Sequence, residues 1–312
     1  MTVAERQGLE KQAIDWIAAD WGTTNLRVWA IAPDGAVLEA RRSDRGMGGL
    51  APEDFEGALL ALAGDWIGPE GAEVLICGMA GARGGWAEAG YAAAPCAPAP
   101  AEATPAPTHD ARLRVRILPG LSQSAPADVM RGEETQIAGL LAAEPDFDGA
   151  LCLPGTHTKW VRLSRGQVTG FRTFLTGELF ALLSSQSILR LSLDDQWNAP
   201  AFDAAVAEAL AAPENVSATL FAIRAEALLA TPAPGAARAR LSGLLTGLEL
   251  AGARPFWEAG RVALVGSAAQ QAQYAPLTAQ GVTLTRHDAE TLTLAGLRLA
   301  RAGLPPIGGA RP

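Results

Sequence analysis

Residues 18–29 read AADWGTTNLRVW and residues 150–163 read ALCLPGTHTKWVRL, and these two stretches decide the fold. When they are aligned, the Gly-Thr dipeptide at positions 22–23 falls on the one at positions 155–156. An apolar run lies on each side of both dipeptides, which is typical of a β-hairpin with a tight turn. In each copy a second turn ending in glycine leads into a third apolar run. The duplicated pattern predicts an α/β protein built from two similar lobes.

Helical and extended patterns alternate after each hairpin, as the α/β class requires. In the first half we expect a helix over 52–66, a strand over 74–77, a proline-rich irregular loop over 92–108, a strand over 114–118 and a helix over 133–143. In the second half we expect a helix over 177–189, Ala- and Leu-rich helices between 202 and 250, strands over 261–265 and 282–285, and a helix over 289–302. We place one lobe at residues 1–118 and the other at 119–312, with a central cleft. The last helix is a candidate to pack back on the first lobe.

Composition excludes several classes of partner. The chain has 312 residues and a formal net charge of -8, which gives no long-range attraction to nucleic acid or to an anionic membrane. The amino-terminal MTVAERQGLEKQ lacks an apolar leader, and no later run approaches the roughly 18 apolar residues of a spanning helix. We therefore expect a cytoplasmic protein. The three cysteines form no C-x-x-C pair, so we expect reduced thiols rather than disulfides or a zinc site. The Ala-rich helices leave a homo-oligomer open.

The two hairpin tips carry residue types that bind polyphosphates. Glycine lets the backbone approach closely, and free amides and hydroxyls donate hydrogen bonds to anionic oxygens. A single Gly-Thr turn is common as a plain hairpin turn, but the duplication and the charged neighbours Asp20 and Lys159 favour phosphate binding. The candidate ATP-contacting residues are Gly22, Thr23, Thr24 and Asn25 in the first tip and Gly155, Thr156, His157, Thr158 and Lys159 in the second.

Asp20 directly precedes the first tip and is a candidate ligand for Mg²⁺. This ion keeps most of its hydration and takes few carboxylates, so we expect Asp20 to hold it through water. The second copy has Leu153 at the matching position, so only the first lobe is expected to serve the metal.

Two levels of family resemblance rest on these motifs. The segment DWGTTNLR at residues 20–27 resembles the first phosphate motif of the acetate and sugar kinase, Hsp70 and actin superfamily, and LPGTHTKW at 153–160 occupies the second. A set of four segments resembles the 2-dehydro-3-deoxygalactonokinase family, in that family's order: GMAGARGGW at 78–86, DVMRGEETQ at 128–136, LPGTHTK at 153–159 and LTGELF at 175–180. The resemblance runs from about residue 18 to about residue 299. It implies the two-lobed actin-like ATPase (ribonuclease H-like) fold.

The resemblance also implies a chemistry. Members of the family phosphorylate a sugar acid at its terminal hydroxyl with ATP and Mg²⁺, giving the 6-phosphate and ADP, so the expected partners are this small molecule and ATP. The first lobe would be the sugar and phosphate side, and the second the nucleotide side. The family's adenosine-side segment matches VGSAAQQAQY at residues 265–274, where Gly266 and Ser267 form the turn. An ordinary strand-to-helix turn is the plain alternative there.

Several residues are candidates to bind the sugar acid. The guanidinium of arginine can donate two parallel hydrogen bonds to a carboxylate, which favours Arg83 and Arg131 as ligands of the sugar acid. The alternative for Arg83 is a solvent-exposed loop residue. Trp86 could wall the sugar, but aromatic residues more often pack in a core. The full set of candidate substrate contacts is Arg27, Gly78, Met79, Arg83, Trp86 and Arg131.

Phosphoryl transfer needs alignment, charge neutralisation and a carboxylate that accepts the hydroxyl proton. Glu133 and Glu134 follow Arg131-Gly132 at an expected helix start, and the turn also resembles the Gly-x-Glu-Glu turn of exopolyphosphatases. Matching on the glycine favours Glu134 as the base, while Glu133 and Asp128 stay open and Asp20 is the acid next to the phosphates. Two acids in a first helical turn also serve simply to complement the helix dipole.

Two other functions use the same fold. A polyphosphate or guanosine pentaphosphate phosphohydrolase would need a long basic phosphate channel, whereas this chain is acidic and ends soon after its last helix. A nucleotide-dependent binding protein would need an added peptide-binding or DNA-binding domain, and neither a long extension nor a helix-turn-helix pattern is present. The sequence therefore favours an ATP-dependent sugar-acid kinase.

Overall fold

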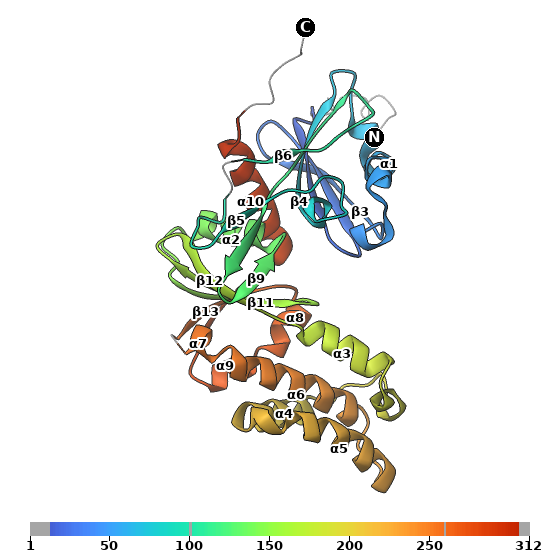
Figure 1. The fold of residues 1–312 in the computed structure, drawn as a ribbon, viewed down its shortest axis with the longest axis vertical. Helices are drawn as coiled ribbons and strands as arrows, with labels where there is room; N and C mark the ends of the chain where they lie inside the picture. Colours follow the sequence, from blue (N-terminus) through green and yellow to red (C-terminus); the bar gives the residue numbers. More distant parts are fainter. Residues whose placement is uncertain (1–12, 100–101, 259, 306–312) are drawn as a thin grey trace, which may run out of the picture. The chain divides into compact units, whose positions relative to one another are not determined.

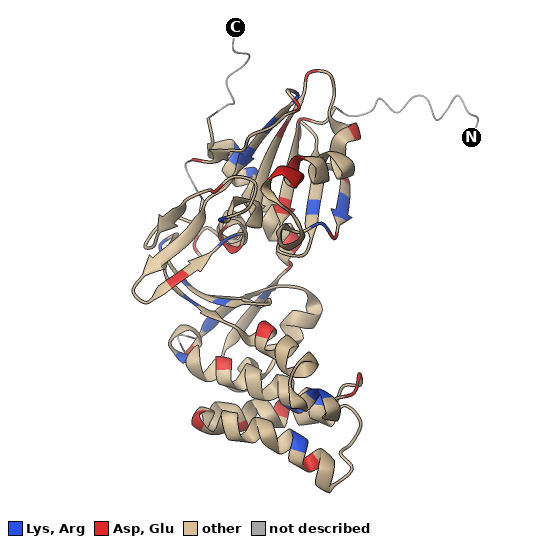
Figure 2. Cartoon of the chain, turned by 45° about the vertical axis from the view of Figure 1, so that its right-hand side comes forward, with Lys and Arg blue, Asp and Glu red and all other residues tan. Residues whose placement is uncertain are grey.

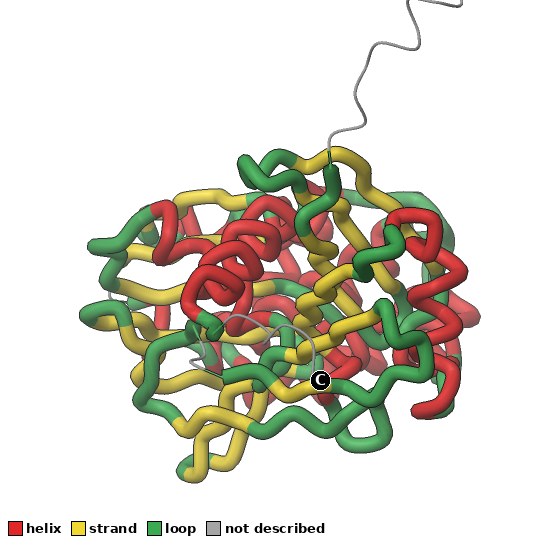
Figure 3. Tube along the Cα trace, turned by 90° about the horizontal axis from the view of Figure 1, so that it is seen from above, coloured by secondary structure: helices red, strands yellow, loops and turns green. Residues whose placement is uncertain are grey.

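The computed structural model describes residues 13–99, 102–258 and 260–305. The expectation for the amino-terminal segment concerns residues 1–12, which lie outside this description. The chain forms two compact units: unit 1 combines the residues up to Asp146 with those from Glu290 onward, and unit 2 runs from Phe147 to Ala289. Helices and strands are interspersed along the chain, which confirms the α/β class (Figure 3).

Unit 1 contains a six-stranded mixed sheet in the order β3-β2-β1-β4-β7-β6. Its strands are β1 (Trp16–Trp21), β2 (Leu26–Ile31), β3 (Val37–Ser43), β4 (Ala72–Gly78), β6 (Thr104–Pro105) and β7 (Leu113–Ile117). β1, β2 and β3 form an antiparallel meander, whereas β4 pairs in parallel with β1 and β7 in parallel with β4. The carboxyl end of β4 therefore lies beside the tip of the β1–β2 hairpin, because Trp21 is in register with Gly78.

Unit 2 repeats this arrangement with a five-stranded sheet in the order β12-β11-β10-β13-β14. Its strands are β10 (Gly149–Leu153), β11 (Thr158–Ser164), β12 (Gln167–Phe174), β13 (Arg261–Val265) and β14 (Thr283–His287). The first three are an antiparallel meander, and β13 and β14 follow in parallel with β10. The two sheets confirm the predicted duplication and the actin-like ATPase fold. The expected central cleft stays a prediction.

Helices pack on both sheets (Figure 1). Unit 1 has α1 (Phe55–Ala63), α2 (Glu133–Ala143) and α10 (Ala289–Gly303). Unit 2 has α3 (Thr176–Ser185), α4 (Ala199–Ala211), α5 (Val216–Leu229), α6 (Ala236–Gly252), α7 (Arg254–Trp257), α8 (Ala268–Gln273) and α9 (Pro276–Ala279). Short 3-10 helices are η2 (Met47–Gly49), η3 (Pro52–Asp54), η4 (Gly64–Trp66), η5 (Met79–Gly81), η6 (Ile188–Ser192) and η7 (Pro213–Asn215).

The sheet of unit 1 is buried on both faces. Alternate residues of β1 point to opposite sides, so Ile17 packs in one core with Phe55 of α1, and Trp16 packs in another with Leu297 of α10. This burial on both faces explains why β1 and β2 read as nearly continuous apolar runs.

The boundary between the units follows Asp146 and differs from the expected boundary at residue 118. The intervening segment belongs to unit 1 because Gly120 of β8 pairs with Tyr91 of β5, and because α2 lies against α10. At this helix contact a side chain on Gly139 would overlap the carbonyl oxygen of Leu292, so the glycine lets the two backbones meet.

One small sheet has no counterpart in the sequence prediction. It consists of β5 (Tyr91–Ala93), β8 (Gly120–Ser124) and β9 (Ala127–Met130), in the order β5-β8-β9. The strands GLSQS and ADVM contain one β-branched residue between them, so local propensity gives almost no strand signal. The central strand β8 pairs with β5 on one side and with β9 on the other, and this pairing supplies the missing stabilisation.

Candidate active site

Unit 1 carries a pocket of about 370 Å³ at the tip of the β1–β2 hairpin. The pocket is lined by Asp20, Gly22, Thr24, Asn25, Arg27 and Arg42. Five of these six are residues predicted from the first phosphate motif. Thr23 lies in the same turn, where its carbonyl oxygen accepts a hydrogen bond from the Gly48 amide at 2.9 Å. The structure thus places the first motif around one polar pocket.

Asp20 holds the central negative charge of this pocket. Its side chain is 13% exposed, and its Oδ2 accepts a hydrogen bond from Arg27 Nη2 at 2.5 Å. Burial raises the pKa of the Asp20 carboxyl, and the guanidinium of Arg27 opposes this rise. Arg27 therefore occupies one carboxylate oxygen and helps to keep the group ionised.

Two further charged residues at this pocket were not predicted. Arg42 of β3 is the register partner of Arg27 and donates a hydrogen bond to Glu290, at the start of α10. Glu290 also lies 3.8 Å from Arg27 Nη1 and accepts a hydrogen bond from Trp29 Nε1 at 3.3 Å. Strand alternation could have indicated Arg42, because it faces the same side as Arg27. No local pattern could have indicated Glu290, which comes from the other end of the chain.

Glu134 is a second buried carboxylate of unit 1, in the first turn of α2. It is 1% exposed, and its Oε2 accepts a hydrogen bond from the Gly132 amide at 2.6 Å. Its Oε1 accepts a hydrogen bond from the Thr135 hydroxyl at 3.2 Å. Burial, and then the negative charge of Glu133, raise the pKa of Glu134 to about 8. This carboxyl can therefore gain or lose a proton near neutral pH.

The end of β4 lies close to the carboxylates of both Asp20 and Glu134. The Cys77 thiol is buried there, and after burial itself the nearby charges of Asp20 and Glu134 raise its pKa further. Gly78 follows with a φ of +92°, and a side chain at this position would lie 2.6 Å from the Trp21 carbonyl oxygen. Glycine is therefore required at residue 78. Two acids separated by more than a hundred positions in the sequence thus lie around one strand end.

The other two candidate bases lie in different surroundings. Glu133 is half-buried, and its Oε2 accepts a hydrogen bond from the Arg131 amide at 3.1 Å. Asp128 is a half-buried residue of β9, and its carboxylate accepts a hydrogen bond from the Val129 amide at 2.8 Å. Of the three acids, Glu134 alone is fully buried.

The guanidinium of Arg131 is engaged by its own unit. The residue is 9% exposed, and its Nη2 donates a hydrogen bond to the Ala89 carbonyl at 2.6 Å. Its guanidinium carbon also lies 4.4 Å from the centre of the Tyr91 ring. These contacts tie the loop before β5 to the start of α2. They leave the guanidinium poorly placed for the substrate carboxylate that the sequence suggested.

The glycine-rich segment after β4 divides into exposed and buried positions. The side chain of Arg83 is 92% exposed and lies 3.9 Å from Glu88. Trp86 is 6% exposed, packs against Trp21 and Phe55, and donates a hydrogen bond to the Pro107 carbonyl. Trp86 therefore serves the core, as the plainer interpretation of the sequence expected. Met79 lies half-buried in η5.

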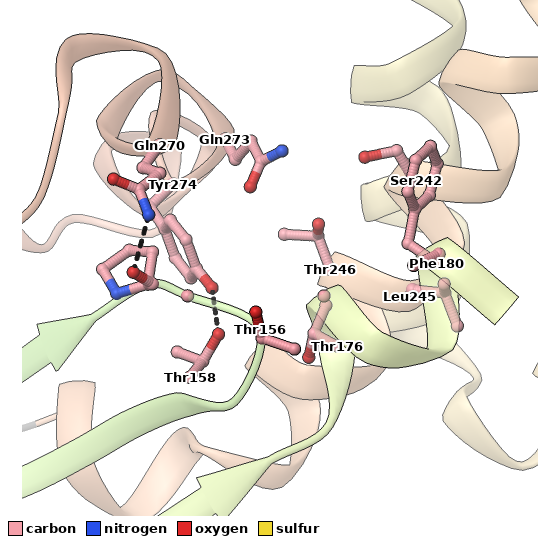
Figure 4. A pocket seen from close by; sticks show the side chains of 14 residues that line it. Thr156, Thr158, Thr176, Phe180, Ser242, Leu245, Thr246, Gln270, Gln273 and Tyr274 are labelled. Atoms are coloured by element: carbon pink, nitrogen blue, oxygen red, sulfur yellow. Dashed lines mark hydrogen bonds between the residues drawn. The ribbon is translucent and has the colours of Figure 1, made fainter. Parts of the chain in front are cut away.

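Unit 2 carries its own pocket, of about 300 Å³ (Figure 4). It is lined by residues 154–158 of the β10–β11 tip, 176–181 of α3, 242–246 of α6 and 270–274 of α8, not all of them consecutive. Gly155, Thr156 and Thr158 of the predicted second motif are among them. The Thr158 hydroxyl lies 3.2 Å from the hydroxyl of Tyr274, so the hairpin tip is linked to the end of α8.

The remaining predicted residues of unit 2 lie around this pocket without lining it. His157 is exposed, with its Nε2 2.5 Å from Oε2 of Glu178. Lys159 is 6% exposed on β11. Gly266 donates its amide to the His287 carbonyl at 3.1 Å, and Ser267 is the N-cap of α8. The family's adenosine-side segment still reaches the pocket through Gln270, Gln273 and Tyr274.

A buried carboxylate from α6 supports the floor of this pocket. Glu249 is 2% exposed and accepts hydrogen bonds from Trp160 Nε1 and the Tyr274 hydroxyl, both at 2.8 Å. The Thr176 hydroxyl also donates to it. Burial raises the pKa of Glu249, and these donors oppose the rise. Nothing local in the sequence indicated Glu249, because its partners come from three other elements.

The residues around Asp20 fit a hydrated magnesium ion. One oxygen of Asp20 is held by Arg27, the pocket beside it has room for an ion with its water shell, and Mg²⁺ needs few protein ligands. Among the described residues, no three His, Cys, Asp or Glu side chains gather as a protein-only metal cage.

Charges of both signs are interspersed in each unit (Figure 2). In the described part of the chain, no helix is long and apolar enough to cross a bilayer.

Comparisons with known proteins identify the family of the chain. The model of the 2-keto-3-deoxy-galactonokinase family matches residues 20–300. A protein of Rhizobium meliloti named probable 2-dehydro-3-deoxygalactonokinase DgoK1 is 40% identical over 300 residues, covering 94% of this chain and 98% of its own. The 2-dehydro-3-deoxygalactonokinase of Escherichia coli is 35% identical, covering 91% of this chain and 96% of its own.

The fold has a close experimental counterpart. A crystal structure from Sinorhizobium meliloti, provisionally assigned as a 2-dehydro-3-deoxygalactonokinase, superimposes with a TM-score of 0.86 at 42% identity. The match covers 95% of this chain and 98% of that one.

Proposed function

The chain belongs to the 2-keto-3-deoxy-galactonokinase family, and we propose that it transfers the γ-phosphoryl group of ATP to the 6-hydroxyl of 2-dehydro-3-deoxy-D-galactonate. The products are the 6-phosphate and ADP. The family and both curated relatives are kinases by name, so the polyphosphate or guanosine pentaphosphate phosphohydrolase has no support. The observation that carries the mechanism is geometric. Asp20 is in register with Cys77 at the end of β4, and Gly132, whose amide binds Glu134, lies against Gly78 at the same strand end.

Asp20 and its hairpin are the proposed phosphate and metal side. Asp20 would hold a hydrated Mg²⁺, which when bound neutralises part of the negative charge on the phosphates. Thr24 and Asn25 line the same pocket and offer hydroxyl and amide donors to phosphate oxygens, while Gly22 donates its own amide to the Asn25 carbonyl and closes the turn. Arg27 contributes a positive charge while it holds Asp20 in place.

Glu134 is the proposed general base. The 6-oxygen of the sugar acid forms a bond to the γ-phosphorus, the bond from that phosphorus to the bridging oxygen breaks, and ADP leaves with the electron pair. The hydroxyl proton passes to the carboxylate of Glu134. A pKa of about 8 suits this role, because a base is most effective when its pKa is close to the working pH. Glu133 and Asp128 are the less buried alternatives.

The sugar acid itself is a carboxylate, and the exposed guanidinium of Arg83 is the proposed partner for it. Gly78 and Met79, at the end of β4, are proposed to border the sugar close to Asp20. Arg131 is proposed to act indirectly, by positioning the turn that carries Glu134.

Unit 2 is the proposed nucleotide side. Its pocket combines the Gly155-Thr156 tip with Tyr274 and Gln273 from the adenosine-side segment. We propose that the tip contacts the phosphates of ATP and that the rest of the pocket holds the nucleoside. His157 and Lys159 are proposed to lie near the phosphates rather than the base.

A coupled assay tests the proposal. ADP formation, measured through pyruvate kinase and lactate dehydrogenase, should require both 2-dehydro-3-deoxygalactonate and Mg²⁺, and ³¹P NMR should show a 6-phosphate. The C4 epimer 2-dehydro-3-deoxygluconate, run in parallel, defines the selectivity. ADP formation that ignores every sugar acid and follows polyphosphate would refute the kinase assignment.

A further inference from the structure

Two hydroxyls of α6 in the pocket of unit 2 have no hydrogen-bond partner among the described residues. Ser242 is 7% exposed and Thr246 is 2% exposed, and both line the pocket. They stand four residues apart on one face of the helix, and Figure 4 shows both directed at the pocket. Glu249, one turn further along α6, already accepts hydrogen bonds from Trp160, Thr176 and Tyr274.

The packing of α6 explains this orientation. Gly243 and Gly247 lie on the neighbouring face, where side chains would overlap the backbone of α4 at Phe202 and Val206. These glycines let α6 press closely against α4. The close contact fixes the rotation of α6 about its axis, and that rotation points Ser242 and Thr246 away from α4.

The hydroxyls of Ser242 and Thr246 open into the pocket, because neither is among the buried side-chain atoms of the described residues that lack a hydrogen-bond partner. A hydroxyl that lines a pocket can bond to water, or to a polar ligand that replaces the water. Other polar groups of this pocket are already committed: Gln270 Nε2 donates to the Pro154 carbonyl, and the Tyr274 hydroxyl donates to Glu249. Ser242 and Thr246 are therefore free to meet a polar ligand.

The opposite wall carries a matching group. The amide of Gln273 points toward the pocket in Figure 4 and makes no hydrogen bond within the described part of unit 2. Phe180 and Leu245 add apolar surface beside Ser242. An apolar wall with a few unpaired donors and acceptors suits a flat heterocycle bearing polar groups at its edge, and suits a phosphate chain poorly.

We propose that Ser242 and Thr246, with Gln273 opposite, are direct contacts of the donor nucleoside and set the affinity of the enzyme for it. This inference rests on the proposed function in placing the nucleotide in unit 2. The proposed function assigns the Gly155-Thr156 tip of the same pocket to the phosphates, and this inference assigns the α6 hydroxyls to the nucleoside.

The test is calorimetric binding of two probes, ADP and inorganic tripolyphosphate, to the full-length protein. Thr246→Val removes the hydroxyl at nearly constant volume, and Thr246→Ser keeps it. Ser242→Ala is combined with Thr246→Val in a double variant. We expect the double variant to bind ADP about 10-fold more weakly or worse and tripolyphosphate as the wild type does. Thr246→Ser should bind ADP normally.

Ser217→Ala, at an exposed position of α5, is the matched control and should leave both affinities unchanged. An ADP affinity unchanged in the double variant overturns the inference while the kinase assignment stands. Equal weakening of ADP and tripolyphosphate also overturns it, because the hydroxyls would then act through the pocket as a whole. A wild-type protein that phosphorylates the sugar acid yet binds no ADP overturns the inference alone, and one that does neither overturns the proposed function as well.

Discussion

Asp20 and Arg27 face each other across the β1–β2 hairpin, with Oδ2 of the carboxylate 2.5 Å from Nη2 of the guanidinium. The pair lies at the mouth of the polar pocket of unit 1. A cross-strand salt bridge of this kind holds a carboxylate at a fixed angle. The hairpin therefore presents a single, oriented negative charge beside its glycine-threonine tip.

Replacing Asp20 by Asn should abolish most of the activity without unfolding the protein. The amide can still accept a hydrogen bond from Arg27, but it lacks the charge that holds a magnesium ion. We expect kcat to fall by about 100-fold or more in the coupled assay. Asp34→Asn, in the exposed β2–β3 turn, is the matched control and should behave as the wild type. A normal rate for Asp20→Asn would remove this residue from the site.

Replacing Glu134 by Gln should lower kcat by about 10²–10⁴-fold, because a glutamine cannot accept the hydroxyl proton. In the wild type, only ionised Glu134 can act, so kcat/KM should rise with pH and level off above an apparent pKa near 8. Glu133→Gln is the matched control on the neighbouring residue and should keep most of the activity. If Glu133→Gln loses its activity and Glu134→Gln stays nearly normal, then Glu133 is the general base and Glu134 is not.

Glu134 should also shape the pH dependence of stability. Its pKa is raised from 4.5 to about 8 in the folded protein, so the folded state binds more protons than the unfolded state between these values. The free energy of unfolding must therefore fall as pH rises through this window. Glu134→Gln should remove this part of the slope, a difference of up to a few kcal/mol between pH 5 and pH 8.5. Urea unfolding of both proteins at the two pH values measures it, and parallel curves would contradict the raised pKa.

Replacing Glu249 by Ala should destabilise unit 2. The change leaves the donors of Trp160, Tyr274 and Thr176 without their shared acceptor in a buried setting. We expect a loss of about 2–4 kcal/mol in the free energy of unfolding, read from urea denaturation. Glu214→Ala, at an exposed position in η7, should change stability by less than about 0.5 kcal/mol. Equal effects for the two substitutions would show that the buried network contributes nothing.

The parts of the molecule that sequence patterns predicted are those with local signals. Both meanders, the parallel strands after them and the final helix follow from apolar runs, glycine turns and helical periodicity in short windows. The first phosphate motif was found for the same reason, since Asp20 to Arg27 form one hairpin. Glu134 was singled out by its neighbours in the sequence, although its depth of burial was not visible there.

The parts that were missed depend on contacts between distant segments. Glu290 reaches Arg42 because α10 returns to the sheet of unit 1, and Glu249 reaches Trp160 because α6 packs in the same core as β11. The contacts of Arg131 were not visible in the sequence for the same reason: its guanidinium meets the Ala89 carbonyl and the Tyr91 ring, which lie about forty residues earlier in the chain. Pairwise contacts of this kind leave no periodic trace in one sequence.

The return of α10 to unit 1 sets the order in which the chain can mature on the ribosome. Unit 2 is one continuous stretch, from Phe147 to Ala289, and can close as soon as that stretch has emerged. Unit 1 begins first but needs Leu297 and Ala300 to cover Trp16 and Trp29. One apolar face of the amino-terminal sheet must therefore stay bare until residues 297–300 have been translated.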